Sequence, residues 1–299
     1  MPMKSLQISA IMGVASAVIL LLANFIPIAI FLVPLPLFVA AFTAGVRGAL
    51  IAMVSGGATV AIGFGLQYAL GFLIIVALPS VLLAHTLERP MFVSGATLWG
   101  VVYVVLAGFS MAIIISTLPF YTPELIEGLQ IDLARMYNVT FQWLRPEEAN
   151  TLSTYVIQYL RASVAIFWVI QGLVNVALTK QILRRFKADI KESSIFRHIS
   201  LPKYWDILVA SLALATYLPG AIGDTALQLL LIGALGFFLL GLKTIHSWIG
   251  KHVERALVAL IPFYIMVVVM FTIIAPMLIC LGLVNHVQGL RHRKAVSNL

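Results

Sequence analysis

The chain has 299 residues, of which 62% are hydrophobic and only 10% are charged, and its mean hydropathy is +1.06. A soluble domain carries about 25% charged residues, so this composition excludes a water-exposed globular protein. The formal net charge is +8, but the Lys and Arg residues gather between apolar blocks, as the positive-inside rule predicts for a membrane protein. We therefore expect no nucleic-acid partner.

Long apolar blocks follow one another along the chain, and many of them reach the roughly 18–20 residues that cross a hydrocarbon core. Backbone groups in lipid must be satisfied within their own segment, so each block predicts a helix. The predicted spans are 6–26, 29–45, 48–64, 67–86, 94–118, 153–180, 205–220, 226–246 and 254–285. The predicted fold class is all-α, a polytopic transmembrane helical bundle with eight or nine spans.

The second block is interrupted by Pro34 and Pro36. Because the apolar stretch after them is short, residues 27–36 are predicted to form an irregular entry on the outer side, buried in protein or bordering a cavity. The sequence Gly45-Val46-Arg47-Gly48 predicts a tight turn with Arg47 as a cytoplasmic anchor.

Two helices are predicted around the segment between the fifth and sixth spans. Residues 122–137 begin with an N-cap threonine and a proline, and their apolar residues recur at helical spacing. They predict an amphipathic helix on the outer leaflet or capping the bundle. Residues 146–187 contain no helix breaker, so they predict one helix about 60 Å long at ~1.5 Å per residue.

The distribution of charge predicts the orientation. Residues 180–205 are rich in Lys and Arg, whereas acids predominate over residues 119–153, so the first segment faces the cytoplasm and the second faces outward. We expect a multi-pass protein of the bacterial inner membrane with a cytoplasmic N-terminus. Nine crossings would leave the basic C-terminus outside. We expect it in the cytoplasm instead, with eight full crossings and either residues 254–285 or an early short span kinked or re-entrant.

Polar side chains inside a membrane are costly and are therefore candidates for function. In the sixth span they share a broad helix face, which predicts a cavity open to the outside between this span and the early ones. Arg161 would bind a carboxylate or phosphate there through its planar fork. Alternatively, Arg161 extends to the outer interface or pairs with Glu148 or with a neighbour's carbonyl. The candidate ligand-binding residues are Asn24, Gln67, Gln158, Arg161, Trp168 and Gln171.

Catalytic and metal-binding motifs are absent from the sequence: there is no Gly-rich phosphate loop, nucleophile elbow, paired carboxylate or HExxH pattern. We therefore expect no enzyme, no metal and no cofactor. Cys280 is the single cysteine, which excludes an intramolecular disulfide. No nucleotide-binding motif or buried proton or sodium relay is apparent, so a transport function would draw its energy from another subunit.

Four stretches carry a family resemblance: PLPLFVAAFTAGVRGAL at 34–50, ALPSVLLAHTLERP at 77–90, FRHISLPKYW at 196–205 and LGLVNHVQGLRHR at 281–293. Together they resemble the YybS-like family of bacterial integral membrane proteins, a domain of unknown function. The N-terminal half is also similar in pattern to the S components of energy-coupling-factor transporters and to MreD, which have six helices. The predicted parts are thus an S-component-like domain at 1–187, a basic cytoplasmic loop at 188–204 and C-terminal transmembrane helices at 205–299.

In S components, small residues of the first helix dock a coupling subunit. The resemblance implies the same role here for Ser9, Gly13 and Ala17, which share one helix face. Such spacing also lets two helices approach closely within one bundle, and both alternatives stay open. The basic segment 184–203 is expected to contact anionic lipid.

Two functions follow as hypotheses. The first is a small-molecule-binding or transport-associated membrane subunit without its own energy source. The second is a structural or assembly protein of the cell envelope, an MreD-like scaffold.

Overall fold

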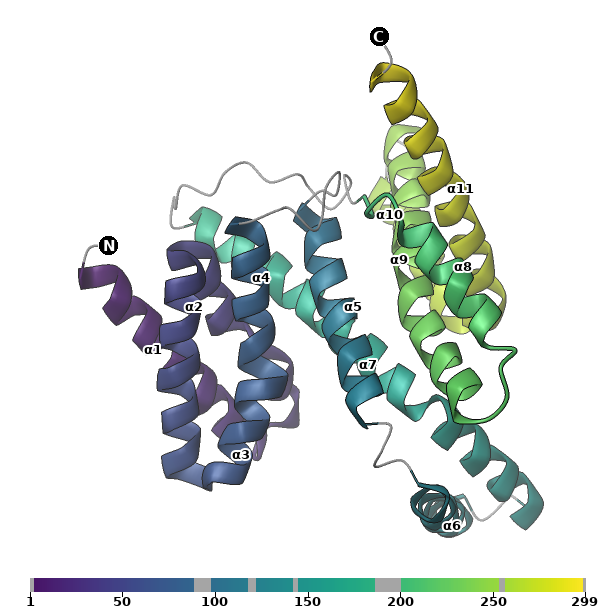
Figure 1. Cartoon of the computed structure of the whole chain (residues 1–299), viewed down its shortest axis with the longest axis horizontal. Helices are drawn as coiled ribbons and strands as arrows, with labels where there is room; N and C mark the ends of the chain where they lie inside the picture. The colour runs from purple at the N-terminus through teal and green to yellow at the C-terminus, as the bar shows by residue number, and fades with distance from the viewer. Residues whose placement is uncertain are drawn as a thin grey trace.

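The computed structural model describes residues 3–88, 98–117, 122–141, 145–185, 200–252 and 256–297, and the regular elements in these ranges are all helical (Figure 1). They are α1 (Met3–Ala23), the 3₁₀ helix η1 (Pro27–Leu32), α2 (Leu35–Phe64), α3 (Leu66–Gly71), the π-helical η2 (Phe72–Ala77), α4 (Leu78–Glu88), α5 (Leu98–Thr117), α6 (Pro123–Thr140), α7 (Pro146–Arg185), α8 (Trp205–Ala215), α9 (Ala221–His252), α10 (Ala256–Val269) and α11 (Phe271–Ser297). Seven stretches of the described residues are long and apolar enough to cross a membrane. The predicted all-α polytopic bundle is confirmed.

The helices form two groups joined by α7. Figure 1 shows α1–α4 on the left and α8–α11 on the right, with α7 running obliquely between them. α7 contacts α2, α5, α6 and α9. A buried cluster around Tyr103, Val169 and Ile232 joins α5, α7 and α9.

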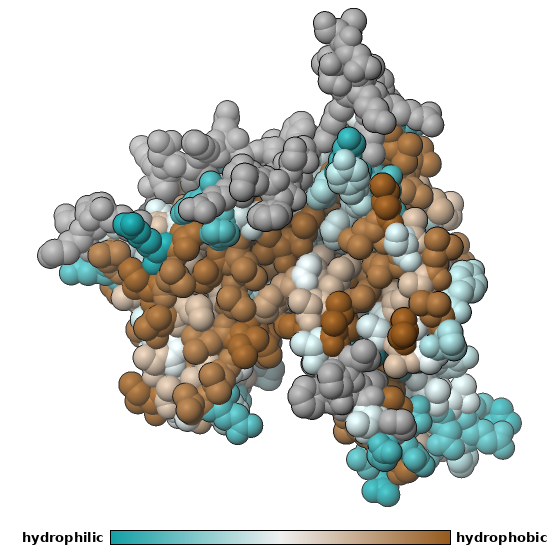
Figure 2. All heavy atoms as spheres, in the orientation of Figure 1, coloured by the Kyte–Doolittle hydropathy of each residue, from teal (hydrophilic) through white to brown (hydrophobic). Residues whose placement is uncertain are grey.

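The surface has distinct apolar and polar regions, and these lie over different groups of helices. Figure 2 shows a brown, hydrophobic expanse over the α1–α4 group and the centre, and hydrophilic residues gathered at the lower right over α6 and the start of α7. A surface with this much exposed apolar area requires a lipid environment. The chain is therefore a multi-pass membrane protein in contact with the bilayer.

The predicted turn at residues 45–48 is confirmed. Gly45 has φ 62° and ψ −154°, so it interrupts α2. A Cβ on Gly48 would lie 2.8 Å from the carbonyl oxygen of Ala40, whereas eight residues of straight helix span about 12 Å. The two arms of α2 are therefore folded against each other. The amide of Val46 donates to Glu88 Oε1 at 2.9 Å, which puts the turn and the end of α4 on the same side, as the charge pattern predicts.

The two helices expected after the fifth span, at 122–137 and 146–187, are also confirmed. Thr122 caps α6, because its Oγ1 accepts from the amide of Leu125 at 3.4 Å. Glu124 accepts hydrogen bonds from its own backbone N–H and from Thr122, which hold the pKa of its carboxyl below the usual value. α7 is one helix of 40 residues, about 60 Å long at ~1.5 Å per residue.

The last apolar block is divided into two helices. Residues 254–285 were expected as one block, kinked or re-entrant as one alternative; the chain breaks at Met270 into α10 and α11, and the break lies at neither internal proline. The contacts with α9 show that the chain reverses at this break. The Tyr264 hydroxyl of α10 lies 3.4 Å from His246 Nδ1, and at the start of α11 the ring centroids of Phe271 and Phe238, further down α9, lie 6.1 Å apart. Further along α11, Asn285 Nδ2 donates to Thr244 Oγ1 at 2.6 Å, so the chain has returned to the level of His246.

Because of this reversal, the last apolar block runs along α9 twice, in opposite directions, instead of once. Both ends of the described chain lie toward the upper side of Figure 1. Apolar residues continue without interruption from α10 into α11. A reversal inside lipid therefore shows no hydrophobic contrast, and hydropathy alone does not reveal it.

Gly45→Ala is expected to destabilise the protein. Backbone angles near φ 62° and ψ −154° are open almost only to glycine, and another residue there costs of order 1–3 kcal/mol. Thermal unfolding in detergent, followed by circular dichroism, measures the loss. The matched control is Gly108→Ala in α5, where an added Cβ meets no atom within 4 Å. Equal unfolding temperatures for both variants would contradict the helical hairpin that the two arms of α2 form at Gly45.

Candidate functional site

The polar side chains of α7 fall into two groups with different surroundings. In the middle of the helix, Gln171 Nε2 donates to the carbonyl of Ile30 at 2.9 Å, and Asn175 Nδ2 donates to that of Phe31 at 2.7 Å. Asn175 is 1% exposed. These side chains hold the backbone of η1, so Gln171 has a structural partner rather than a free amide facing a cavity.

The N-terminal part of α7 borders a cavity of about 230 Å³ between α6, α7 and α9. Two of the predicted ligand-binding residues, Gln158 and Arg161, line it. The full lining is Ile126, Gln130, Thr154, Ile157, Gln158, Arg161, Ala221, Asp224 and Gln228. The cavity therefore lies against α6 and α9, not against the early spans as the sequence suggested.

The cavity contains charges of both signs. Arg161 is half-buried and Asp224 lies in the first turn of α9. An arginine offers several N–H donors in a fixed plane, and a carboxylate offers only acceptors. The lining can therefore bind groups of opposite charge at two places.

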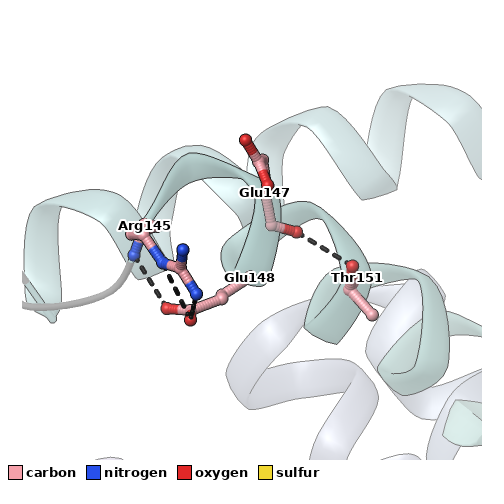
Figure 3. Close-up of polar contacts among 4 residues, drawn as sticks. All are labelled: Arg145, Glu147, Glu148 and Thr151. Carbon is pink, nitrogen blue, oxygen red and sulfur yellow. Dashed lines mark hydrogen bonds and ion pairs between the residues drawn. The ribbon is translucent and has the colours of Figure 1, made fainter.

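Glu148, the acid considered as a partner for Arg161, is held elsewhere. Arg145 Nη2 lies 2.7 Å from Glu148 Oε1, and the Arg145 amide donates to Glu148 Oε2 at 3.0 Å. Figure 3 shows this pair at the start of α7, beside the hydrogen bond from Thr151 to the Glu147 carbonyl. The Arg161–Glu148 alternative is therefore not observed.

Gln228 gives the cavity its most unusual polar group. Its side chain is only 3% exposed, and its Oε1 has no hydrogen-bond partner among the residues that the structure describes. Buried side-chain acceptors are nearly always satisfied, because desolvating them without a partner costs about 1–3 kcal/mol. A buried acceptor in a cavity wall is a place where a bound donor would lower the free energy.

The remaining predicted ligand-binding residues lie outside this cavity. The Asn24 amide bonds the carbonyl of Leu21 at the end of α1. Gln67 is exposed in the first turn of α3. Trp168 packs on Phe109 of α5, with ring centroids 5.4 Å apart. The structure therefore unites Gln158 and Arg161 and places the other four candidates in separate surroundings.

The face of α1 considered for docking a separate subunit is covered by α2. Ser9 and Ala17 are both 0% exposed. A Cβ on Gly13 would collide with the carbonyl of Ala52 and the hydroxyl of Ser55. Of the two alternatives for this small-residue face, packing within the bundle is the observed one, because its close fit to α2 leaves no room for a partner.

The basic segment 184–203 lies mostly outside the described residues, so its expected contact with anionic lipid is not visible. Just before it, Lys180 of α7 is 5% exposed, and its Nζ lies 5.3 Å from the centroid of the Trp99 ring. Within the described ranges, no three His, Cys, Asp or Glu side chains gather in a way that would hold a metal ion.

Four polar residues of the cavity were not among the sequence candidates: Gln130, Thr154, Asp224 and Gln228. Gln228 carries the same signal as the residues of α7, since it is a polar side chain inside an apolar block. Gln130 and Asp224 lie on amphipathic or terminal segments, where polar residues are ordinary, so the sequence contained no signal for them.

Asn175→Leu is expected to lower the free energy of unfolding by about 1–3 kcal/mol, because it leaves the Phe31 carbonyl without its donor. The unfolding temperature in detergent, monitored by tryptophan fluorescence, is the readout. Asn24→Leu is the control, because that amide is exposed and surface changes usually stay within about 0.5 kcal/mol. Similar unfolding temperatures for the two variants would mean that the α7–η1 contact contributes little.

Comparison with known proteins gave one match. A search of curated proteins and a search of solved structures found no similar chain. The model of the family described as predicted membrane protein, DUF2232, matches residues 14–285. This range runs from α1 into α11 and includes the hairpin at Gly45, all of α7 and the cavity residues. The chain therefore belongs to the DUF2232 family of predicted membrane proteins.

Proposed function

We propose that this protein is a small-molecule-binding subunit of the membrane, whose ligand enters the cavity between α6, α7 and α9. The observation that carries the proposal is the buried Gln228 acceptor, which lines the same cavity as Arg161 and Asp224. A cavity with a few convergent polar groups on an otherwise apolar wall is the usual form of a ligand site. Packing alone gives no reason to bury an amide oxygen without a donor.

The size and charges of the cavity define the class of ligand. About 230 Å³ lies below the ~300–1,000 Å³ of pockets for drug-sized molecules, which favours a small polar solute. Arg161 suits a carboxylate or phosphate group. Asp224 and the Gln228 oxygen both accept hydrogen bonds, so they suit an ammonium or amide group. The proposed ligand is thus a small molecule that carries an anionic group and a hydrogen-bond donor, such as a zwitterion.

The orientation follows from the charge pattern and is part of the same proposal. α6 and the start of α7, which form the hydrophilic region in Figure 2, belong to the acidic segment expected to face outward. The cavity then receives its ligand from outside a bacterial inner membrane, and both chain termini are cytoplasmic. The basic segment 184–203 would contact anionic lipid headgroups on the cytoplasmic side.

The second hypothesis, a scaffold of the cell envelope, has less support from the geometry. The small-residue face of α1, which the S-component resemblance assigned to a coupling subunit and which a scaffold would also use, packs within the bundle, where Ser9 and Gly13 lie against α2. The exposed face of α1 carries Ile11, Val14 and Val18, which suit lipid as well as a partner helix.

Loss of the Arg161 guanidinium is expected to release the ligand. The protein is purified in mild detergent, and the small molecules that remain bound are identified by mass spectrometry. We expect a polar small molecule with the wild type and at least about tenfold less with Arg161→Gln, since a hydrogen bond to a charged group contributes about 1.5–3 kcal/mol.

Arg145→Gln is the matched control. It removes an arginine from the same helix, but one that is exposed and bound to Glu148, so ligand retention should not change. Two results oppose the proposal: no polar small molecule bound to the wild type, or equal retention by both variants. Recovery of envelope-assembly proteins alone would favour the scaffold.

A further inference from the structure

A pair of ionisable side chains, one buried and one partly exposed, lies in the C-terminal helices, outside the cavity lining. Asp206 of α8 and His286 of α11 face each other, with Oδ1 and Nε2 4.0 Å apart. The His286 side chain is 5% exposed and that of Asp206 is 29% exposed. The two residues are far apart in the sequence, so only the fold brings them together.

Both residues are held in place by neighbouring contacts. The Trp205 indole N–H donates to the Gly233 carbonyl at 3.1 Å, and the ring lies 5.5 Å from Tyr103 of α5. These contacts fix the start of α8, and hence Asp206. On α11, Asn285 Nδ2 donates to Thr244 Oγ1 at 2.6 Å.

The His286 ring is enclosed by α9 as well. It packs edge-on against Phe237, with ring centroids 5.8 Å apart. Gly282, one turn before it, lies so close to α9 that a Cβ would collide with the Phe237 carbonyl. The imidazole therefore has little freedom to turn away from Asp206.

Burying this pair costs desolvation free energy, and a functional role accounts for that cost. Ionisable side chains are seldom buried in a protein unless they are paired. A buried ion pair is weak evidence for stability, because desolvation offsets the attraction between the charges. Histidine is also the side chain that changes charge near neutral pH. The attraction between α8 and α11 therefore depends on whether His286 carries a proton.

We propose that Asp206 and His286 form a proton-binding site that couples α8 to α11. With a proton on His286, an imidazolium faces the Asp206 carboxylate and the two helices attract each other. Without it, the carboxylate faces a neutral ring, and the attraction between the helices is lost. The greater exposure of Asp206 makes its side the route by which the proton enters.

Other ionisable groups on the helices packed against α11 have their own positions. His246 of α9 lies 3.4 Å from the Tyr264 hydroxyl of α10. Lys243 lies on α9 beside Thr244, and Asp224 lies in the first turn of that helix. The Tyr103 hydroxyl of α5 donates a hydrogen bond to the Ile232 carbonyl at 2.5 Å. Within the described part of the chain, Asp206 is the acid that lies within 4.0 Å of the His286 ring.

The test follows the ring of His286 directly. Full-length protein with isotope-labelled histidine is placed in lipid nanodiscs, and its histidine ring signals are recorded by NMR as a function of pH. Comparison with His286→Gln assigns the signal. We expect it to titrate between about pH 5 and 8, and we expect the midpoint to change by about one pH unit or more in Asp206→Asn, because an opposite charge nearby shifts a pKa by 1–3 units.

Asp132→Asn is the control, since this exposed acid on α6 lies in a surface pair with Arg135 and should leave the midpoint unchanged. Asp206→Glu keeps a carboxylate and should keep most of the wild-type shift, which makes the test informative even if Asp206→Asn fails to fold. An unchanged midpoint in Asp206→Asn, or a His286 signal that does not titrate over this range, would overturn the proposal. Neither result depends on whether the outer cavity binds a ligand.

Discussion

The structure depends on how irregular backbone is satisfied inside lipid. A 3₁₀ helix exposed to the membrane leaves carbonyl oxygens that water does not reach, and each unsatisfied group costs several kcal/mol. None of the side chains of η1 is buried. The carbonyls of Ile30, Phe31 and Val33, which lie in η1 or directly after it, nevertheless accept hydrogen bonds from side chains of other helices. Gln171 and Asn175 of α7 bind those of Ile30 and Phe31, and Ser16 of α1 binds that of Val33 at 2.6 Å.

These hydrogen bonds determine what the rest of α7 can do. They fix the middle of a 40-residue helix to the N-terminal hairpin, while its outer part continues past the hairpin toward α6 and α9. There Gln158 and Arg161 line the cavity with Gln228. One helix thus carries two sets of polar residues. In the sequence the two sets look equivalent, because both lie within the same apolar block. Their difference is in their surroundings: the inner set faces η1, and the outer set faces a cavity.

Much of the helical framework could be predicted from the sequence. Hydropathy, the Gly45 turn, the Thr122 cap and the unbroken run after Pro146 are local signals, because each depends on residues close together in the chain. The reversal at Met270 has no such signal, since apolar residues continue through it and both Pro262 and Pro276 stay inside helices. The length of the block, its two prolines and the charge balance at the C-terminus indicated more than one simple span, but none of them located the break.

The sites could be predicted only in part, for a related reason. The spacing of Gln158 and Arg161 shows that they share a face of α7, but it does not show what packs opposite that face. The early spans were the expected neighbours, and α9 is the observed one. The Asp206–His286 pair has the same origin, since neither residue has a special spacing within its own helix. Contacts between distant helices depend on tertiary packing, which one sequence does not encode in its local periodicity.

The central claim of the proposal is that the N-terminal part of α7 borders a cavity that is reached from outside the membrane, whereas its middle packs against η1. Cysteine labelling in intact cells or oriented vesicles tests it directly. With Cys280→Ser as background, since this is the chain's single cysteine, Gln158→Cys and Asn175→Cys are treated with a membrane-impermeant maleimide. The account predicts rapid labelling at position 158 from outside and none at position 175. Labelling of position 158 only after the membrane is permeabilised, or equal labelling at both positions, would contradict it.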